Sequence, residues 1–322
     1  MHKTKIDWAD ATWNPLTGCF HQCPYCYAEK MSKRFSGDVR LNLTQTEHYQ
    51  KEGELYTLEK PFPARNGQAL IYPFGFAPTY HKYRLDDLDK WKNGVNIFVC
   101  SMADMFGAWV PEEWILEIFR KCQEHPQHNY LFLTKNPKRY QELDNKNLLP
   151  QESNFWYGTS ITNNTADQNV EDWFRTLTYP TFLSIEPIMG EIDMYLSIFY
   201  DVDWIIVGAE SGNRKGKVKP EKEWIDHIAE HCKSENIPLF MKGSLEELMG
   251  RDFTTEFPSL LKSNRPSQKL SACCLECQKN LRKADMTAIL SREGRQRSTN
   301  TEGYVCEECF GKLREGWAFS GF

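Results

Sequence analysis

Short runs of consecutive apolar residues recur along most of the chain. They lie at residues 69–74, 96–100, 130–133, 155–157, 181–185, 204–207 and 239–241. Half-exposed strands alternate apolar and polar residues, whereas continuous apolar runs of this length are typical of parallel strands that are buried on both faces. The pattern therefore predicts a buried, parallel β-sheet.

Patterns with the period of an amphipathic helix lie between several of these runs. Apolar residues share one helical face at Trp114, Ile115, Ile118, Phe119 and Cys122 after Pro111, at Val170, Trp173, Phe174 and Leu177, and at Trp224, Ile225, Ile228 and Cys232. Residues 27–36 are also compatible with a helix. Strands and helices that alternate at this spacing predict an α/β fold built from βα repeats, although periodicity alone does not separate a barrel from an open sheet.

Polar residues follow six consecutive predicted strands, at the point where each strand ends. They are Ser101 and Asp104, Thr134 to Asn136 with Lys135, Thr159 and Ser160, Glu186, Glu210 within the segment 208–212, and Lys242 with Gly243. Any one of them could be explained as a helix N-cap or a turn residue. Six in succession favour an active site, because parallel α/β folds build their sites from the carboxyl ends of the strands.

Three cysteines lie close together near the start of the chain, with the spacing C-x3-C-x2-C. They are Cys19, Cys23 and Cys26, and Gly18 just before them allows a tight bend. Four thiolates complete the protein ligation of a four-iron cluster, so three would leave one iron open to another ligand. The alternative is a partial zinc knuckle in which His21 supplies the fourth ligand.

The cysteine spacing, with Tyr25 before the last thiol, resembles the signature of the radical S-adenosylmethionine (SAM) superfamily. The resemblance implies that Cys19, Cys23 and Cys26 bind a [4Fe-4S] cluster whose open iron chelates SAM, and that an electron from the cluster cleaves SAM to a 5′-deoxyadenosyl radical. It also implies a partial or full TIM-like (β/α) barrel, and an external electron donor such as a flavodoxin or ferredoxin. Tyr25 is then expected beside the cluster. The strand ends, represented by Ser101, Asp104, Lys135, Ser160, Glu186 and Glu210, are expected to hold SAM and substrate.

Longer motifs resemble a narrower family of bacteriophage-associated, radical SAM-like proteins with the same three-cysteine motif. The similarity rests on Trp13-Asn14-Pro15, Ser101-Met102-Ala103-Asp104, Leu133 to Pro137, Ser184 to Pro187 and Val207 to Gly212, and it spans residues 4–245. That family has no settled reaction, so the resemblance implies the chemistry of the cofactor but no substrate.

Composition limits the other possibilities. The chain has 322 residues, of which 40% are hydrophobic and 26% charged, as is ordinary for a globular protein. No apolar run approaches the ~20 residues that cross a bilayer, and the first residues carry no secretory signal. Eleven cysteines then favour metal ligation and buried thiols in the reducing cytoplasm, with Cys100, Cys122 and Cys232 as core residues.

The sequence changes character after a predicted barrel domain at residues 1–245. Residues 246–270 predict a linker, and residues 271–322 a small metal-binding module in which Cys274, Cys277, Cys306 and Cys309 form two C-x2-C pairs. Such pairs are typical of zinc ribbons, and a second iron–sulfur cluster is the alternative. Earlier in the chain, residues 37–68 are polar and are interpreted as a lid or a substrate-recognition insert.

The tail is also more basic than the rest of the chain. Residues 260–322 contain eleven Lys and Arg against seven Asp and Glu, while the whole chain has a formal net charge of −5. Arg292, Arg295 and Arg297 lie between the two cysteine pairs and suggest phosphate contacts. The leading hypothesis is a radical SAM enzyme that acts on a nucleic acid or a nucleotide. The alternative is a zinc-stabilised module that binds nucleic acid or protein, has no enzymatic activity and has no affinity for SAM.

Overall fold

A computed structural model describes residues 2–64, 68–163, 179–194, 199 and 202–261. Beyond these it describes only the backbone of four strands, β15 (Ser271–Cys273), β16 (Asn280–Arg282), β17 (Met286–Leu290) and β18 (Thr301–Cys306). The chain divides into two units, Met1–Asn264 and Arg265–Phe322. In the second unit, β15 pairs with β16 and β17 pairs with β18, both antiparallel.

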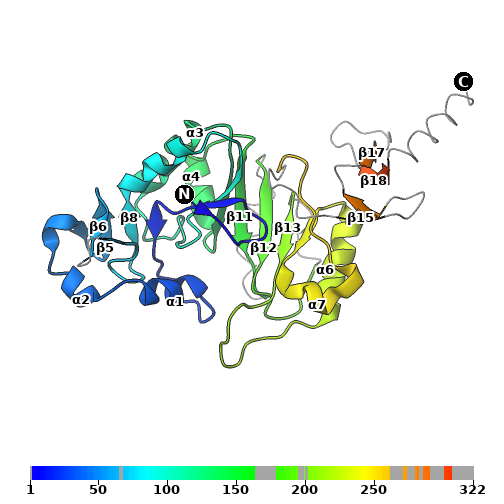
Figure 1. Cartoon of the computed structure of the whole chain (residues 1–322), viewed down its shortest axis with the longest axis horizontal. Coiled ribbons are helices and arrows are strands. Elements are labelled where there is room, and N and C mark those ends of the chain that lie inside the picture. The colour runs from blue at the N-terminus through cyan, green and yellow to red at the C-terminus, as the bar shows by residue number, and fades with distance from the viewer. Residues whose placement is uncertain are drawn as a thin grey trace, which may run out of the picture. The chain divides into compact units, whose positions relative to one another are not determined.

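The first unit is built on an eight-stranded sheet with the order β1-β2-β9-β10-β11-β12-β13-β14 (Figure 1). Its strands are β1 (His2–Lys3), β2 (Ala11–Trp13), β9 (Asn96–Val99), β10 (Asn129–Thr134), β11 (Phe155–Ser160), β12 (Thr181–Ile185), β13 (Ile205–Val207) and β14 (Leu239–Met241). All neighbours from β2 to β14 are parallel, and only β1 runs antiparallel to β2. The predicted parallel α/β fold is therefore confirmed, and six of its strands come from the apolar runs.

One predicted strand was placed in the wrong sheet. Only Ala69–Leu70 of the run 69–74 forms a strand (β7), and it pairs antiparallel with β6 (Phe62–Pro63) in a separate two-stranded sheet. Pro73 in this run has no N–H to donate to a sheet. The first parallel strand is instead β2, which pairs with β9 and lies in the segment that the apolar pattern left unassigned.

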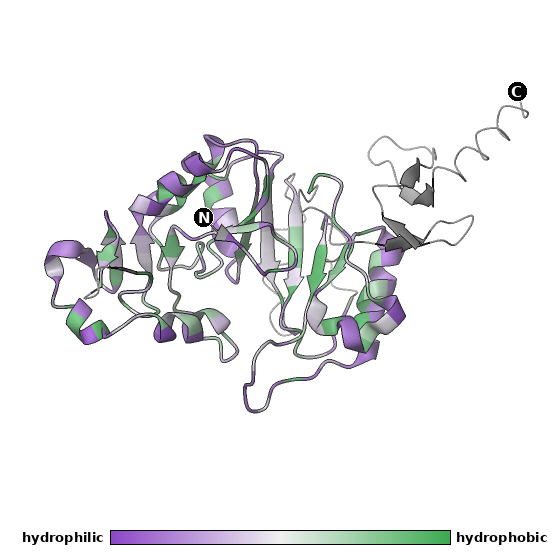
Figure 2. Ribbon diagram, in the orientation of Figure 1, coloured by the Kyte–Doolittle hydropathy of each residue, from purple (hydrophilic) through white to green (hydrophobic). Residues whose placement is uncertain are grey.

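Three described helices cover one face of the sheet. They are α3 (Glu112–Gln123), α4 (Lys138–Asn145) and α6 (Lys222–Glu235). Their apolar sides are buried against alternate residues of the strands, and Figure 2 shows hydrophilic residues on their other sides. Cys100, Cys122 and Cys232 are buried in this layer, as predicted. The helix predicted around residues 170–177 lies outside the described residues.

The opposite face of the sheet is filled by large aromatic side chains. Because successive strand residues point to opposite faces, Phe98, Leu131, Trp156, Phe182, Ile206 and Phe240 meet on this side together with Trp8, Trp204 and Leu261. The rings of Trp8 and Phe98 are 4.6 Å apart, centroid to centroid. These side chains close the interior below the carboxyl ends of the strands.

The sheet curls without closing into a barrel, since β1 and β14 stand at opposite ends of the strand order. The N-terminal segment reaches the residues that follow β14, where the backbone N–H of Gly243 donates to Oδ2 of Asp7 at 3.1 Å. The first unit ends with η5 (Gly243–Leu245), α7 (Glu246–Met249) and η6 (Gly250–Asp252). Residues 246–261, which the sequence assigns to a linker, belong to this unit and contribute Leu261 to the inner face.

The segment between the cysteines and β9 forms a small structure of its own. It contains α1 (Tyr27–Arg34), α2 (Val39–Asn42), η1 (Thr46–His48) and η2 (Lys82–Lys90). Its strands β8 (Thr79–His81), β5 (Leu55–Leu58) and β4 (Gln50–Glu52) form a four-stranded sheet with β3 (Leu16–Thr17), which precedes the cysteines. Tyr56 and Phe74 stack at 4.0 Å in its core. We call residues 37–90 the insert. Among the described residues, no helix has both the length and the apolarity that crossing a bilayer requires.

Candidate functional site

A cavity of about 960 Å³ opens at the carboxyl ends of the parallel strands. Its lining includes every first-unit site residue expected from the sequence, namely Cys19, Cys23, Tyr25, Cys26, Ser101, Asp104, Lys135, Ser160, Glu186 and Glu210. Trp8 and Phe98 of the inner aromatic cluster also line it. The fold thus gathers residues up to 240 positions apart in the sequence, from Thr4 to Ser244, around one space.

The cysteine loop is tied to the sheet at its first residues. Gly18 has a φ of +88°, and a Cβ atom there would lie 2.3 Å from the backbone oxygen of Ala77, so only glycine fits. The N–H of Gly18 donates to the carbonyl of Met102 at 2.9 Å, and that of Cys19 donates to the carbonyl of Phe76 at 3.1 Å. The first thiol is therefore held between the end of β9 and the insert.

The three thiols of the loop are unpaired and partly buried. Cys26 is the N-cap of α1 and accepts a hydrogen bond at Sγ from the N–H of Glu29 at 3.4 Å, while Sγ of Cys19 accepts one from the N–H of His21 at 3.5 Å. Burial raises the pKa of Cys19 to about 12 and also raises that of Cys26. In the metal-free chain these thiols are protonated at neutral pH, so ligation of a metal displaces protons.

The thiols do not surround a single point. Among the described residues, no three His, Cys, Asp or Glu side chains converge closely enough to hold one metal ion. Of the six cysteines whose side chains the structure describes, Cys19, Cys23 and Cys26 line the cavity and the other three are buried. Nε2 of His21 is bound to Asp104, and His21 is not part of a converging set of metal ligands among the described residues.

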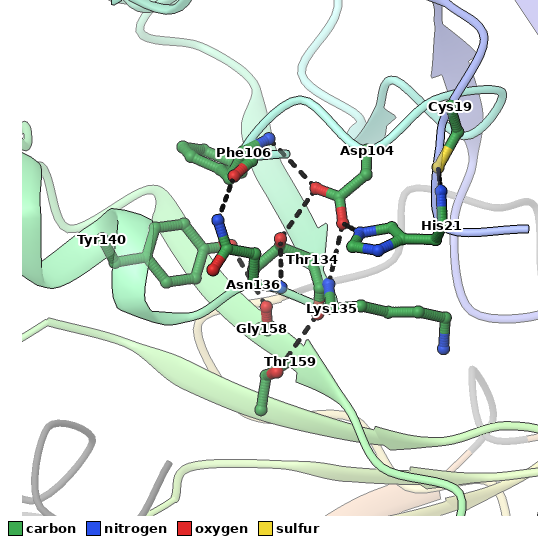
Figure 3. Close-up of polar contacts among 10 residues, drawn as sticks. All are labelled: Cys19, His21, Asp104, Phe106, Thr134, Lys135, Asn136, Tyr140, Gly158 and Thr159. Carbon is green, nitrogen blue, oxygen red and sulfur yellow. Dashed lines mark hydrogen bonds and ion pairs between the residues drawn. The ribbon is translucent and has the colours of Figure 1, made fainter. Parts of the chain in front are cut away.

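Asp104 connects the cysteine loop to two strands (Figure 3). Its Oδ2 atom accepts hydrogen bonds from Nε2 of His21 at 2.7 Å and from the N–H of Lys135 at 2.9 Å. Its Oδ1 atom accepts from the hydroxyl of Thr134 at 2.7 Å and from the N–H of Phe106 at 3.0 Å. This buried carboxylate is thus fully used in positioning its neighbours.

Asn14 and Tyr27 orient the residues that follow β9. Oδ1 of Asn14 accepts from the hydroxyl of Ser101 and the N–H of Met102, each at 3.2 Å, and the Tyr27 hydroxyl donates to the carbonyl of Ser101 at 2.8 Å. The sequence gives Asn14 only as part of a motif, without this role. At the end of β10, Nζ of Lys135 lies 5.4 Å from the centre of the Tyr25 ring, which is the distance of a cation–π contact.

Two carboxylates of the cavity are paired with cations, one of which, Lys242, was among the predicted strand-end residues and the other, Arg214, was not. Glu186 binds Nζ of Lys242 at the end of β14. Glu210 accepts two hydrogen bonds from Arg214, at 2.6 and 2.7 Å, and this guanidinium lowers the pKa of the carboxyl group. The spacing of four residues between Glu210 and Arg214 was the feature of the sequence from which this ion pair could have been predicted.

The other predicted sites lie in the tail. Cys274, Cys277, Cys309, Arg292, Arg295 and Arg297 are outside the described residues, and Cys306 is described only as backbone at the end of β18. The zinc or iron–sulfur module and its phosphate contacts stay predictions.

Fold and site together define an α/β protein with a cysteine-lined cavity at the carboxyl ends of its parallel strands. The chain belongs to the family described as "Protein of unknown function (DUF5131)", which matches residues 3–249. This match contains the whole cysteine loop and every residue of the cavity. No curated protein matches the chain.

Several solved structures of spore photoproduct lyase show a weak likeness. A cysteine-to-serine mutant is 12% identical with a TM-score of 0.35, and the match covers 98% of this chain and 75% of that one. A double mutant with bound AdoMet and dinucleoside spore photoproduct is 12% identical with a TM-score of 0.37, and covers 98% and 73% of the two chains. Scores at this level assign neither a fold nor an activity to the chain.

Proposed function

We propose that this protein is a radical SAM enzyme whose [4Fe-4S] cluster is held by Cys19, Cys23 and Cys26. The single observation that carries the proposal is the cavity, which is lined by these three thiols together with polar residues from the ends of the six parallel strands β9 to β14. A four-iron cluster bound by three thiols keeps one iron open to another ligand, and the strand ends supply the groups that would hold that ligand.

The donor set fits a cluster better than a single ion. A mononuclear zinc site needs its ligands around one point, and the described residues offer no such convergence. In a cluster each thiolate binds a different iron, so the sulfur atoms lie further apart. The N–H groups that donate to Cys19 and Cys26 match the hydrogen bonds that tune the potential of cluster sulfurs.

The chain's own residues divide the remaining work between them. When bound, the cluster supplies the electron that cleaves SAM into methionine and a 5′-deoxyadenosyl radical, after reduction by an external donor such as a flavodoxin or ferredoxin. Tyr25 and Lys135 lie beside the cysteine loop and would contact the rings and the carboxylate of SAM, respectively. Ser101, Ser160, Glu186 and Glu210 offer polar contacts along the strand ends.

The aromatic floor of the cavity serves the same chemistry. Trp8 and Phe98 are almost fully buried and close the interior from below. A closed apolar floor excludes water from one side of the site, and exclusion of water limits side reactions of a reactive intermediate.

Anaerobic reconstitution with iron and sulfide tests the proposal directly. We expect a chain carrying Cys19→Ala, Cys23→Ala and Cys26→Ala to bind four fewer iron atoms than the wild type. The reduced wild type should convert SAM to 5′-deoxyadenosine and methionine, as chromatography would show. Cys232→Ala removes a buried thiol that does not line the cavity and is the matched control.

Two results would refute this function. One is equal iron content in the triple variant and the wild type, and the other is a loaded wild type that neither binds nor cleaves SAM. Zinc at the first three cysteines, with no affinity for SAM, would support the non-enzymatic alternative.

A further inference from the structure

Some of the cations that line the cavity have no acidic partner. Three carboxylates of the lining are paired with cations: Asp87 with Lys90, Glu186 with Lys242 and Glu210 with Arg214. Asp7 accepts from the N–H of Gly243, and Asp104 accepts four hydrogen bonds. Among the cations of the lining, Lys5, Arg84 and Lys135 have no carboxylate within ion-pair distance in the described part of the chain. These cations are therefore available to an anionic ligand.

Arg84 is held rigidly although it has no acidic partner. Its Nε donates to the hydroxyl of Tyr83 at 3.2 Å, and its two terminal nitrogens donate to the carbonyls of Asn14 at 3.0 Å and Ile71 at 3.1 Å. A guanidinium has five N–H groups. Three neutral acceptors thus fix its orientation and leave two N–H groups for a ligand.

The wall around Arg84 is aromatic. Tyr72, Phe76 and Tyr83 of the insert line the same cavity, and the exposed side chain of Ile71 lies at its edge. Aromatic rings stack on nucleobases, and a guanidinium matches the geometry of phosphate. This wall carries aromatic rings and a fixed guanidinium without an acidic partner. It therefore suits a ligand that carries both a nucleobase and a phosphate.

We propose that the insert wall binds a phosphorylated nucleoside, with its phosphate on Arg84 and its base against the aromatic rings. The inference rests on the proposed function and names the substrate class of that site. Lys135 and Arg84 serve different ligands. Lys135 lies beside Tyr25 of the cysteine loop, whereas Arg84 lies on the insert. The cavity volume of about 960 Å³ is at the upper end of the ~300–1,000 Å³ that is typical of ligand pockets.

Calorimetric titration of the reconstituted full chain tests this site. The probes are the four common ribonucleoside 5′-monophosphates, the matching nucleosides, ribose 5-phosphate and a dinucleotide, each with and without saturating SAM. We expect at least one monophosphate or the dinucleotide to bind about tenfold or more tightly than its nucleoside and than ribose 5-phosphate, in the presence of SAM. The preference between monophosphate and dinucleotide tells a free nucleotide from a unit of a strand.

Variants then locate the binding. Arg84→Gln should reduce the preference for the phosphorylated form to less than about threefold while leaving nucleoside binding unchanged. Tyr72→Leu should weaken nucleoside and nucleotide alike. Arg251→Gln, an exposed arginine of η6, is the matched control and should change neither. Thermal unfolding of each variant identifies those that fold, and the comparison of probes on the wild type holds without any variant.

Three outcomes would overturn the inference: no preference for phosphorylated probes, a preference that Arg84→Gln retains in a folded chain, or complete displacement of the nucleotide by SAM. Titration of the reconstituted chain separates the two proposals. Arg84-dependent nucleotide binding in a chain that, after reconstitution, neither binds nor cleaves SAM would refute the radical chemistry and keep this site. SAM cleavage without nucleotide binding would keep the radical chemistry and refute the nucleotide site.

Discussion

His21 donates a hydrogen bond from Nε2 to Oδ2 of Asp104 at 2.7 Å, and so joins the cysteine loop to the residues after β9. The same carboxylate receives the N–H of Lys135 and the hydroxyl of Thr134 from β10. Asp104 therefore fixes the position of the thiols relative to the sheet together with the backbone hydrogen bonds of Gly18 and Cys19.

Replacement of that side chain, Asp104→Asn, should destabilise the first unit. An amide offers one acceptor oxygen and turns an NH2 group toward donors, so at least one buried donor loses its partner. We expect the free energy of unfolding to fall by about 1–3 kcal/mol. Urea unfolding followed by tryptophan fluorescence measures it, with Asp86→Asn, whose side chain is 79% exposed, as the control. Equal stabilities of the two variants would contradict this role of Asp104.

Gly18→Ala should prevent the cysteine loop from taking its position. The positive φ alone costs about 1–3 kcal/mol for a residue with a Cβ atom, and the contact with the carbonyl of Ala77 adds to it. Gly53→Ala separates the two effects, because Gly53 also has a positive φ, +58°, but a Cβ atom added there would have no other atom within 4 Å. Thermal unfolding should show a clearly larger loss for Gly18→Ala, together with reduced iron uptake. Similar losses for both variants would mean that the close approach to Ala77 is unimportant.

The Glu210–Arg214 pair predicts a dependence of stability on pH. The guanidinium lowers the pKa of Glu210 below its ordinary value of 4.5, so folding favours the charged form. The resulting stabilisation is complete above that ordinary value and is lost as the pH falls through the lowered pKa. The wild type should therefore lose part of its stability on acidification that Glu210→Gln does not lose. Unfolding midpoints between pH 7 and pH 3.5 test this.

Glu230→Gln serves as the control for that titration, because Glu230 is exposed on α6. Its acid profile should follow that of the wild type. If Glu210→Gln also followed the wild type, the pair would have no part in the acid response.

Removal of the second unit should leave the cavity intact, provided that the chain is cut after Asn264. Leu261 is fully buried in the inner aromatic face, so a chain that ends at Pro258 loses it and should be destabilised by about 2–5 kcal/mol. The chain that ends at Asn264 should keep the thermal stability of the first unit, its iron and its cleavage of SAM. Loss of the stability, the iron and the cleavage of SAM in the chain that ends at Asn264 would show that the tail belongs to the catalytic unit.

The parallel strands were accessible from the sequence because their residues are apolar on both faces. Ile205 packs against the helices while Ile206 packs inward, and a run of this kind has few other interpretations. The strand β2 was not accessible, since Ala11–Trp13 is short and contains a threonine. Its place in the sheet comes from pairing with β9, which lies more than eighty residues away.

The strand-end rule also explains how much of the site was found. Ser101, Lys135 and Glu186 line the cavity because carboxyl ends of parallel strands meet at one edge. The contribution of the insert was missed. Tyr72 lies in the apolar run 69–74, which was interpreted as a strand, and Arg84 lies in a mixed polar segment with no helical or strand period. The placement of Arg84 depends on hydrogen bonds to the carbonyls of Asn14 and Ile71, which no local period encodes.

The cavity is assembled from both ends of the first unit, and this has a consequence for the making of the protein. Cys26 leaves the ribosome early, whereas Lys242 and Ser244 complete the opposite wall. At roughly 5–20 residues per second, roughly 10–45 s of synthesis separate them. During that time the thiols of the growing chain are exposed to oxygen and stray metal ions. The wall that encloses these thiols is complete only after that time, so a cell that makes this protein in air must keep its nascent thiols reduced until then.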